Sequence, residues 1–435
     1  MKNRPGVAPL ALCCLALLVA SCGGGGDGGG GEAKIRLLNL SRGYTSLDLI
    51  TNLDAEDNDD DATQASAVAL DAVSEYATLE PDDYTIKLKR TGSGSILRSF
   101  AGEQLVKDTV NTYVAFGEVG QFGALLIDDT QDDADAGETK LSVANVSAAG
   151  GLDVYITDAT TDLDDTTPVL AAVGSALASF STNSGSYRLR VTASGDNDDV
   201  RLDIANFSLP DKGVVTLILT STRGGTLVDA VYLPQGGQPV KTLNTRARLR
   251  GAVGIANGAN ASIQAGGKAV LTSATAGVIA SRYTLLDAGI VPVTLTVNGA
   301  AVAAPDLSLQ SGADYTLLVW SNANGPQTSL IVDDNRFPSS SGNTKLRLLN
   351  GMSTLGAPLT LSMDFSPLLE GTPVGQVSEI VEVPGGSDRQ FDITNTSTAA
   401  AVLTRSSITL QGGSVYTFFM TDNGSTPIGV LRRDR

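Results

Sequence analysis

Clusters of aspartate are the residues of this sequence that could most readily do chemistry. Carboxylate oxygens are the ligands that Ca²⁺ prefers, and this cation takes six to eight of them. Without a cation, the like charges repel one another and keep an exposed loop extended. We expect solvated loops here and hold an ordered cation site as the alternative. The clusters lie at 54–61, 128–133, 162–165 and 196–199.

Three residues of the first cluster, Asp57, Asp59 and Asp61, have the spacing of the first three ligands of an EF-hand loop. That loop requires a glycine where this sequence has Ala62 and a bidentate glutamate where it has Val68. The motif is therefore incomplete and predicts no metal site. Asp57, Asp59 and Asp61 remain the candidate cation ligands of the chain.

The sequence contains no histidine. This excludes imidazole bases, Ser-His-Asp and Cys-His nucleophiles, and His-bound zinc. Two carboxylates could still hydrolyse a glycosidic bond, but among 47 acidic residues some suitable pair is always present, so its presence is no evidence for this activity.

The segment Gly266-Gly267-Lys268 lacks the upstream glycine and the Ser/Thr of a phosphate-binding loop, so we expect a hairpin turn there. We predict no enzymatic activity and no cofactor.

The N-terminus has the order of an export signal. Lys2 and Arg4 precede an apolar run over 7–20, which is shorter than the ~18–20 residues that span a bilayer. The run ends in Val19-Ala20-Ser21-Cys22, which resembles the lipobox of bacterial lipoproteins. The resemblance implies that residues 1–21 are a cleaved signal peptide and that Cys22 carries the lipid. The membrane would then be a partner of the chain through this lipid.

The residues after Cys22 favour a particular destination. Residues 22–32 are rich in glycine and predict a flexible tether between the lipid and the folded part. By the same resemblance, Gly23 in place of aspartate favours delivery to the outer membrane. We therefore expect a lipid-anchored protein of the bacterial cell envelope.

Beyond the tether, one sequence unit recurs. The segment 34–39 returns almost unchanged at 345–350 and more loosely at 140–145, and a divergent copy starts at 246. The segments 309–316 and 410–417 repeat the same period of about 100 residues, which is the size of one β-sandwich. We expect independent units joined like beads, with repeats at 33–137, 138–242, 243–342 and 343–435.

Within the units the apolar period is two. Tyr84, Ile86 and Leu88 alternate with Thr85 and Lys87, which predicts a strand with one face in a core and one in water. About seven such strands per unit, separated by turn signals, predict an all-β protein of four tandem immunoglobulin-like antiparallel β-sandwiches. The single tryptophan is expected in core packing.

Four segments of the first unit resemble the bacterial domain-of-unknown-function 4397 family of exported proteins. They are 35–39, 46–49, 84–86 and 113–117. The resemblance implies tandem β-sandwiches on envelope proteins. It supplies no activity and no catalytic residue.

The charge balance limits the partners. The net charge of −17 repels phosphate backbones, so nucleic acid is not expected. The acidic surplus is concentrated in residues 33–137, which leaves the distal units free to meet a protein or glycan ligand. We predict a monomeric structural, adhesion or binding module. The alternatives are a carbohydrate- or calcium-binding surface protein and a carboxylate-based hydrolase.

Overall fold

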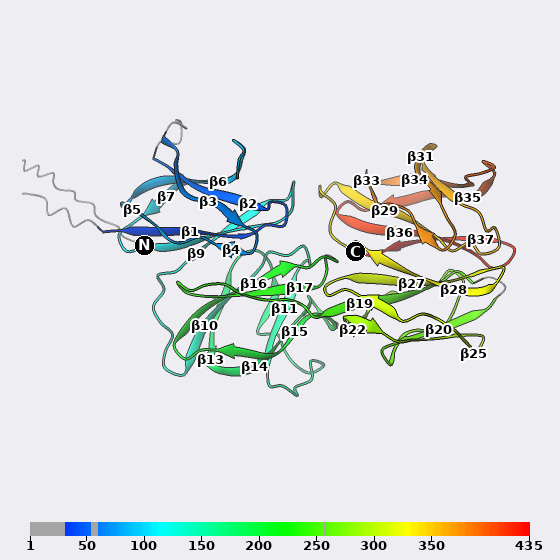
Figure 1. The fold of residues 1–435 in the computed structure, drawn as a ribbon, viewed down its shortest axis with the longest axis horizontal. Coiled ribbons are helices and arrows are strands. Elements are labelled where there is room, and N and C mark those ends of the chain that lie inside the picture. The colour runs from blue at the N-terminus through cyan, green and yellow to red at the C-terminus, as the bar shows by residue number, and fades with distance from the viewer. Residues whose placement is uncertain (1–30, 54–59, 256–257) are drawn as a thin grey trace, which may run out of the picture.

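The chain folds almost entirely into β-strands. The computed structural model describes residues 31–53, 60–255 and 258–435. Within these ranges there are strands and turns without an α-helix, and hence no helix that is long and apolar enough to cross a membrane. The strands form sheets that enclose apolar cores (Figure 1). The predicted all-β sandwich class is confirmed.

Four units, named here by their strands, follow one another along the chain. Unit 1 comprises β1 (Ala33–Leu40), β2 (Ser46–Asn52), β3 (Ala62–Ala69), β4 (Ala72–Val73), β5 (Ala77–Leu79), β6 (Asp82–Arg90), β7 (Ile96–Leu105), β8 (Val110–Phe116) and β9 (Gly123–Asp128). Unit 2 comprises β10 (Glu138–Asn145), β11 (Leu152–Thr157), β12 (Leu170–Val173), β13 (Ala178–Asn183), β14 (Gly185–Ala193), β15 (Asp196–Leu209), β16 (Gly213–Ser221), β17 (Val228–Pro234) and β18 (Val240–Thr242).

The second half of the chain is built in the same way. Unit 3 comprises β19 (Arg246–Val253), β20 (Asn260–Ala265), β21 (Lys268–Thr275), β22 (Thr284–Asp287), β23 (Gly289–Val291), β24 (Val293–Val297), β25 (Ala300–Val302), β26 (Leu307–Leu309), β27 (Asp314–Asn322) and β28 (Gly325–Asp333). Unit 4 comprises β29 (Asn343–Asn350), β30 (Leu359–Met363), β31 (Ser366–Thr372), β32 (Gln376–Val377), β33 (Val381–Pro384), β34 (Gly386–Asn395), β35 (Ala401–Leu410), β36 (Ser414–Asp422) and β37 (Pro427–Arg433).

Each unit has two main sheets. The second sheet is antiparallel throughout, with the orders β3-β2-β6-β7, β12-β11-β14-β15, β21-β20-β24-β25 and β31-β30-β34-β35. The first sheet contains the central runs β1-β8-β9, β10-β16-β17, β19-β27-β28 and β29-β36-β37. In each run the first two strands are parallel. Most of the unit lies between them in sequence, which provides the long crossover that parallel pairing needs.

This register brings both ends of a unit to one place. In unit 1, Ile35 lies beside Asn111 in the parallel pair, and Asn111 lies beside Asp128 at the end of β9. The chain therefore enters and leaves the first sheet at the same end. The equivalent strands of the other units have the same relation.

Each unit has its own apolar core between its sheets. Ile86 and Leu88 are completely buried there, as the alternation predicts. Lys87 was expected in water but is only 3 % exposed. Its ammonium group lies 2.7 Å from a carboxylate oxygen of Asp61. The face of β6 that points away from the core is therefore covered by an ion pair.

Local turn chemistry agrees with the sequence. Gly266 and Gly267 form the turn of the β20–β21 hairpin, as expected, and both have positive φ angles of 55° and 76°. Glycine adopts this backbone region without steric penalty. At the end of the core, the hydroxyl of Tyr315 accepts a hydrogen bond from the backbone N–H of Gln310 at 2.9 Å. This contact resembles the tyrosine corner of immunoglobulin-like sandwiches.

The units are packed in pairs instead of being joined like beads. Figure 1 shows unit 1 against unit 2 on the left and unit 4 against unit 3 on the right. A second set of buried apolar residues lies between the first sheets of each pair. Each unit contributes a residue of its first strand and the parallel partner of that residue: Leu38 and Val114, Ala144 and Ile218, Ala252 and Leu318, and Leu349 and Phe419. Because equivalent positions meet, both interfaces are isologous, as in a symmetric dimer. Trp320, expected in a core, packs at the edge of the second interface.

Candidate functional site

Most of the site residues predicted from the sequence lie outside the described residues. These are Cys22, Asp57 and Asp59. Asp61 is described, and it faces lysines. One of its carboxylate oxygens contacts the ammonium of Lys87 at 2.7 Å and the other contacts that of Lys89.

The amide of Asn52 also donates a hydrogen bond to Asp61 at 2.9 Å. Burial alone would raise the pKa of Asp61, but the hydrogen bonds from Lys87 and Lys89 lower this pKa to about 2. The carboxylate is therefore charged and already neutralised by two cations, an arrangement that holds the strands together.

The aspartates of 196–199 are also engaged by cations. Asp196 and Asp198 lie 3.1 and 3.4 Å from the guanidinium of Arg282, and Asp199 lies 2.6 Å from Arg201. Among the residues that the structure describes, no group of three or more acidic or thiol side chains could hold a metal ion.

One set of deeply buried polar groups was not predicted. In three units an arginine of the first strand, a threonine of the parallel strand and an aspartate at the end of the last strand lie together on the outer face of the first sheet. We call them the Arg–Thr–Asp groups: Arg36, Thr112 and Asp129; Arg250, Thr316 and Asp333; and Arg347, Thr417 and Asp434. In unit 2, Ser142 takes the place of the arginine, because it pairs with Thr216 in the same register.

The group of unit 3 shows the geometry. Nε of Arg250 donates to Oγ1 of Thr316 at 2.9 Å, and that hydroxyl donates to Oδ2 of Asp333 at 2.7 Å. The hydroxyl of Tyr283 donates to the same carboxylate oxygen at 2.7 Å, and its ring lies 4.8 Å from the Arg250 guanidinium carbon. Tyr76 stacks on Arg36 and donates to Asp129 in the same way in unit 1.

The groups of units 3 and 4 exchange partners across their interface. Arg250 forms a 2.6 Å ion pair with Asp434 of unit 4, and Arg347 forms a 2.6 Å ion pair with Asp333 of unit 3. All four side chains are at most 4 % exposed. The two sandwiches are therefore joined by reciprocal buried charges.

The protonation states favour a structural role for these groups. Burial would raise the pKa of Asp333, but Arg347 and Arg250 hold it below its usual value. Burial and the neighbouring Asp333 raise the pKa of Tyr283 well above its usual value. The aspartate stays charged and the tyrosine neutral near neutral pH, so neither is poised to transfer a proton.

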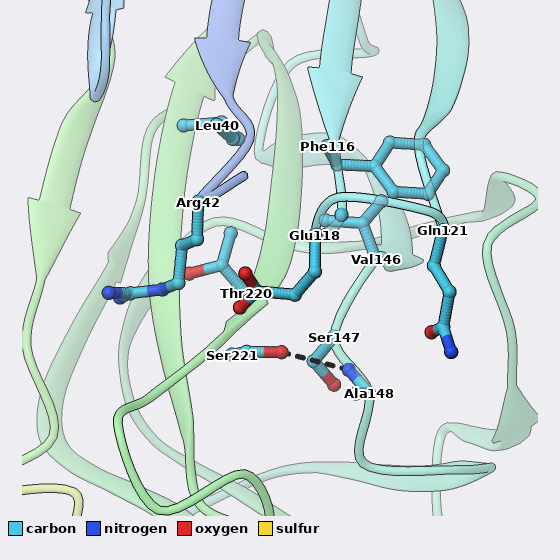
Figure 2. Close-up of a pocket in the computed structure, with 11 residues that line it drawn as sticks. Leu40, Arg42, Phe116, Glu118, Gln121, Val146, Ser147, Ala148, Thr220 and Ser221 are labelled. Carbon is cyan, nitrogen blue, oxygen red and sulfur yellow. Dashed lines mark hydrogen bonds between the residues drawn. The ribbon is translucent and has the colours of Figure 1, made fainter. Parts of the chain in front are cut away.

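A small pocket lies between units 1 and 2 (Figure 2), with a volume of about 160 Å³. Leu40 and Phe116 form its apolar side, and Figure 2 shows Ser221 at the opposite side, where its hydroxyl accepts a hydrogen bond from the Ala148 N–H at 2.9 Å. The buried hydroxyl of Thr220 has no hydrogen-bond partner in the described part of the chain. The pocket can hold water or a small polar group.

The match to a protein family concerns one part of the chain. Residues 33–155 match a domain of unknown function, DUF4397. This match supports the resemblance seen in the sequence and extends from β1 into β11. No curated protein matches the chain.

Two solved structures align with the chain at low identity. One is CBMbc (family CBM26) from Eubacterium rectale Amy13K in complex with maltoheptaose, with 12% identity over 46% of this chain and 96% of that chain and a TM-score of 0.16. The other is the Bacillus anthracis TIE protein, with 10% identity over 90% of this chain and 68% of that chain and a TM-score of 0.15. TM-scores this low support no argument about the fold or function of this chain.

Proposed function

We propose that the chain is a lipid-anchored protein of the bacterial cell envelope whose four tandem β-sandwich repeats form a structural, adhesion or binding module without catalytic activity. The observation that carries the proposal is the use of the Arg–Thr–Asp groups. Arg250 and Arg347 are at most 4 % exposed and pair with Asp434 and Asp333 across the interface of units 3 and 4. Charges used in this way are not available to a substrate. The match of residues 33–155 to an uncharacterised domain family agrees with this assignment.

The anchor is tested at Cys22. The wild-type protein should sediment with membranes and should require detergent for release, because two or three acyl chains hold a protein stably in a bilayer. Cys22→Ser should leave the fold intact and appear in the soluble exported fraction. Cys14→Ser is the matched control, since it removes a thiol from the segment that is expected to be cleaved. Recovery of Cys22→Ser in the membrane pellet after a high-salt wash would contradict the anchor.

The destination is tested at Gly23. We propose delivery to the outer membrane, where wild-type protein should be found after separation of the two membranes on a density gradient. Gly23→Asp should move the protein to the inner membrane with its lipid retained. An unchanged distribution would contradict the proposed role of this position.

A carbohydrate or Ca²⁺ ligand is the alternative that the sequence leaves open. In the described residues the candidate Asp61 is bound by two lysines, and this does not favour a cation site. A glycan array and a calcium titration of the melting temperature would decide between the alternatives. A response in either assay would replace the purely structural assignment.

A further inference from the structure

A charged cleft of about 580 Å³ lies where units 2, 3 and 4 meet. Its volume is in the range of sites for small molecules. Unit 2 contributes Arg201, unit 3 contributes Arg248 and Arg282, and the end of unit 4 contributes Arg432 and Arg435. The cleft is therefore rich in guanidinium groups, which bind oxyanions with two parallel hydrogen bonds.

The carboxylates of the cleft neutralise only some of these arginines. Arg248 binds both oxygens of Asp314 at 2.7 Å. Asp199 is shared between Arg201 at 2.6 Å and Arg248 at 3.4 Å. Among the described residues, neither Arg432 nor Arg435 forms an ion pair within 4.0 Å. Asp434, which also lines the cleft, is paired with Arg250, so this part of the cleft keeps a surplus of positive charge.

Several guanidinium nitrogens at this place have no partner. Nε and Nη1 of Arg201, Nη2 of Arg250, Nε of Arg432 and Nη2 of Arg435 are buried without a hydrogen bond in the described part of the chain. The side chain of Arg250 is 1 % exposed. Buried unpaired donors are rare in native proteins and indicate a missing partner, such as an ion.

Neighbouring positive charges further destabilise the charged form of Arg435, one of these buried arginines. Burial, together with repulsion by Arg201 and Arg248, lowers the pKa of Arg435 to about 9. The remaining contacts of Arg435 are neutral, since Nη1 donates to the carbonyls of Gly225 at 2.6 Å and Asn335 at 2.9 Å. A bound anion would remove the repulsion.

We propose that this cleft binds a small oxyanion, a carboxylate or a phosphate group, at Arg201, Arg432 and Arg435. The volume of about 580 Å³ fits a small molecule. Because the lining comes from units 2, 3 and 4, binding it ties these units together.

Isothermal titration calorimetry of the full chain at constant ionic strength tests this site, with inorganic phosphate in one arm and citrate in the other. Saturable binding of one anion is expected, and the arm that responds identifies the chemistry. Arg432→Gln and Arg435→Gln should each weaken binding by at least about tenfold. Neither variant leaves a carboxylate without its ion-pair partner, so both should fold.

Arg405→Gln is the control, because this arginine of β35 is exposed and does not line the cleft. It should change the affinity by less than about threefold. Absence of saturable heat with both anions would overturn the proposal. Binding that survives in both Arg432→Gln and Arg435→Gln would overturn it as well. Neither result would affect the anchor or the proposed module, which are tested at Cys22 and Gly23.

Discussion

Arg347 of β29 and Asp333 of β28 form a buried ion pair of 2.6 Å although they belong to different sandwiches. The equivalent pair, Arg250 with Asp434, crosses the same interface in the opposite direction. Each sandwich therefore supplies the counter-ion of its neighbour. Separating the two sandwiches breaks both short pairs and leaves each arginine only the aspartate of its own unit at 3.7 Å.

We expect Asp333→Asn to lower the free energy of unfolding by about 3–5 kcal/mol, because it removes the 2.6 Å partner of the buried Arg347 and leaves this guanidinium only Asp434 at 3.7 Å. Urea unfolding followed by circular dichroism measures this loss. Asp364→Asn is the control, since Asp364 pairs with Arg389 on the surface, and it should change stability little. Equal losses in the two variants would contradict a special role for the buried pair.

Phe419 is completely buried but belongs to the interface between units 3 and 4 and to neither core. Phe419→Ala should therefore destabilise the protein by about 3–5 kcal/mol, as a core truncation does. Phe365→Ala should have almost no effect, because Phe365 is 79 % exposed. Thermal unfolding of both variants compares them directly. A mild effect at Phe419 would show that the pairing of the units contributes little.

Tyr315 and Tyr416 accept backbone hydrogen bonds at equivalent places, from Gln310 at 2.9 Å and from Gln411 at 3.3 Å. Tyr315→Phe should lower stability by about 1 kcal/mol, because it leaves a partly buried N–H without its acceptor. Tyr187→Phe, which removes an exposed hydrogen bond to Asn183, should lower it less. Denaturant titration resolves the difference. An unchanged stability of the Tyr315→Phe variant would contradict a stabilising role of the tyrosine corner.

The acid stability of unit 1 depends on Asp61. Its pKa is lowered from 3.8 to about 2 in the folded chain, so the charged form is favoured by folding. This stabilisation is complete above pH ~4 and is lost as the pH falls toward about 2. Asp61→Asn should be less stable at neutral pH and should lose less stability across this pH interval. Urea midpoints measured from pH 6 to pH 2 test the prediction, and parallel curves for both proteins would refute it.

The parts of the fold that could be predicted from the sequence are encoded by residues that are close together in the chain. The two glycines at 266 and 267 encode their turn locally, and the repeated segments 309–316 and 410–417 place Tyr315 and Tyr416 at the same point of their sandwiches. Alternation likewise identifies Ile86 and Leu88 as core residues. A period of two requires no knowledge of the rest of the molecule.

The burial of Arg347 and Lys87 could not be predicted in this way, because the residues that cover them lie outside their own strands. A strand pattern indicates which residues share a face but not what lies against that face. A partial signal exists in the adjacent leucines Leu348 and Leu349, since uninterrupted apolar residues indicate a strand covered on both sides. The cleft arginines lie far apart in sequence, at 201, 432 and 435, and only the packing of three units brings them together.

In each sandwich the chain enters and leaves the first sheet at the same end, and this determines how the sandwich responds to force. In unit 1 the beginning of β1 and the end of β9 lie at the same end of one sheet, with Asn111 between Ile35 and Asp128. A pull on these two ends acts across the strands, so the hydrogen bonds open one after another, as in a zipper. A protein held at one end and loaded at the other would therefore lengthen by successive opening of sandwiches, and the interfaces within each pair would set the order in which they yield.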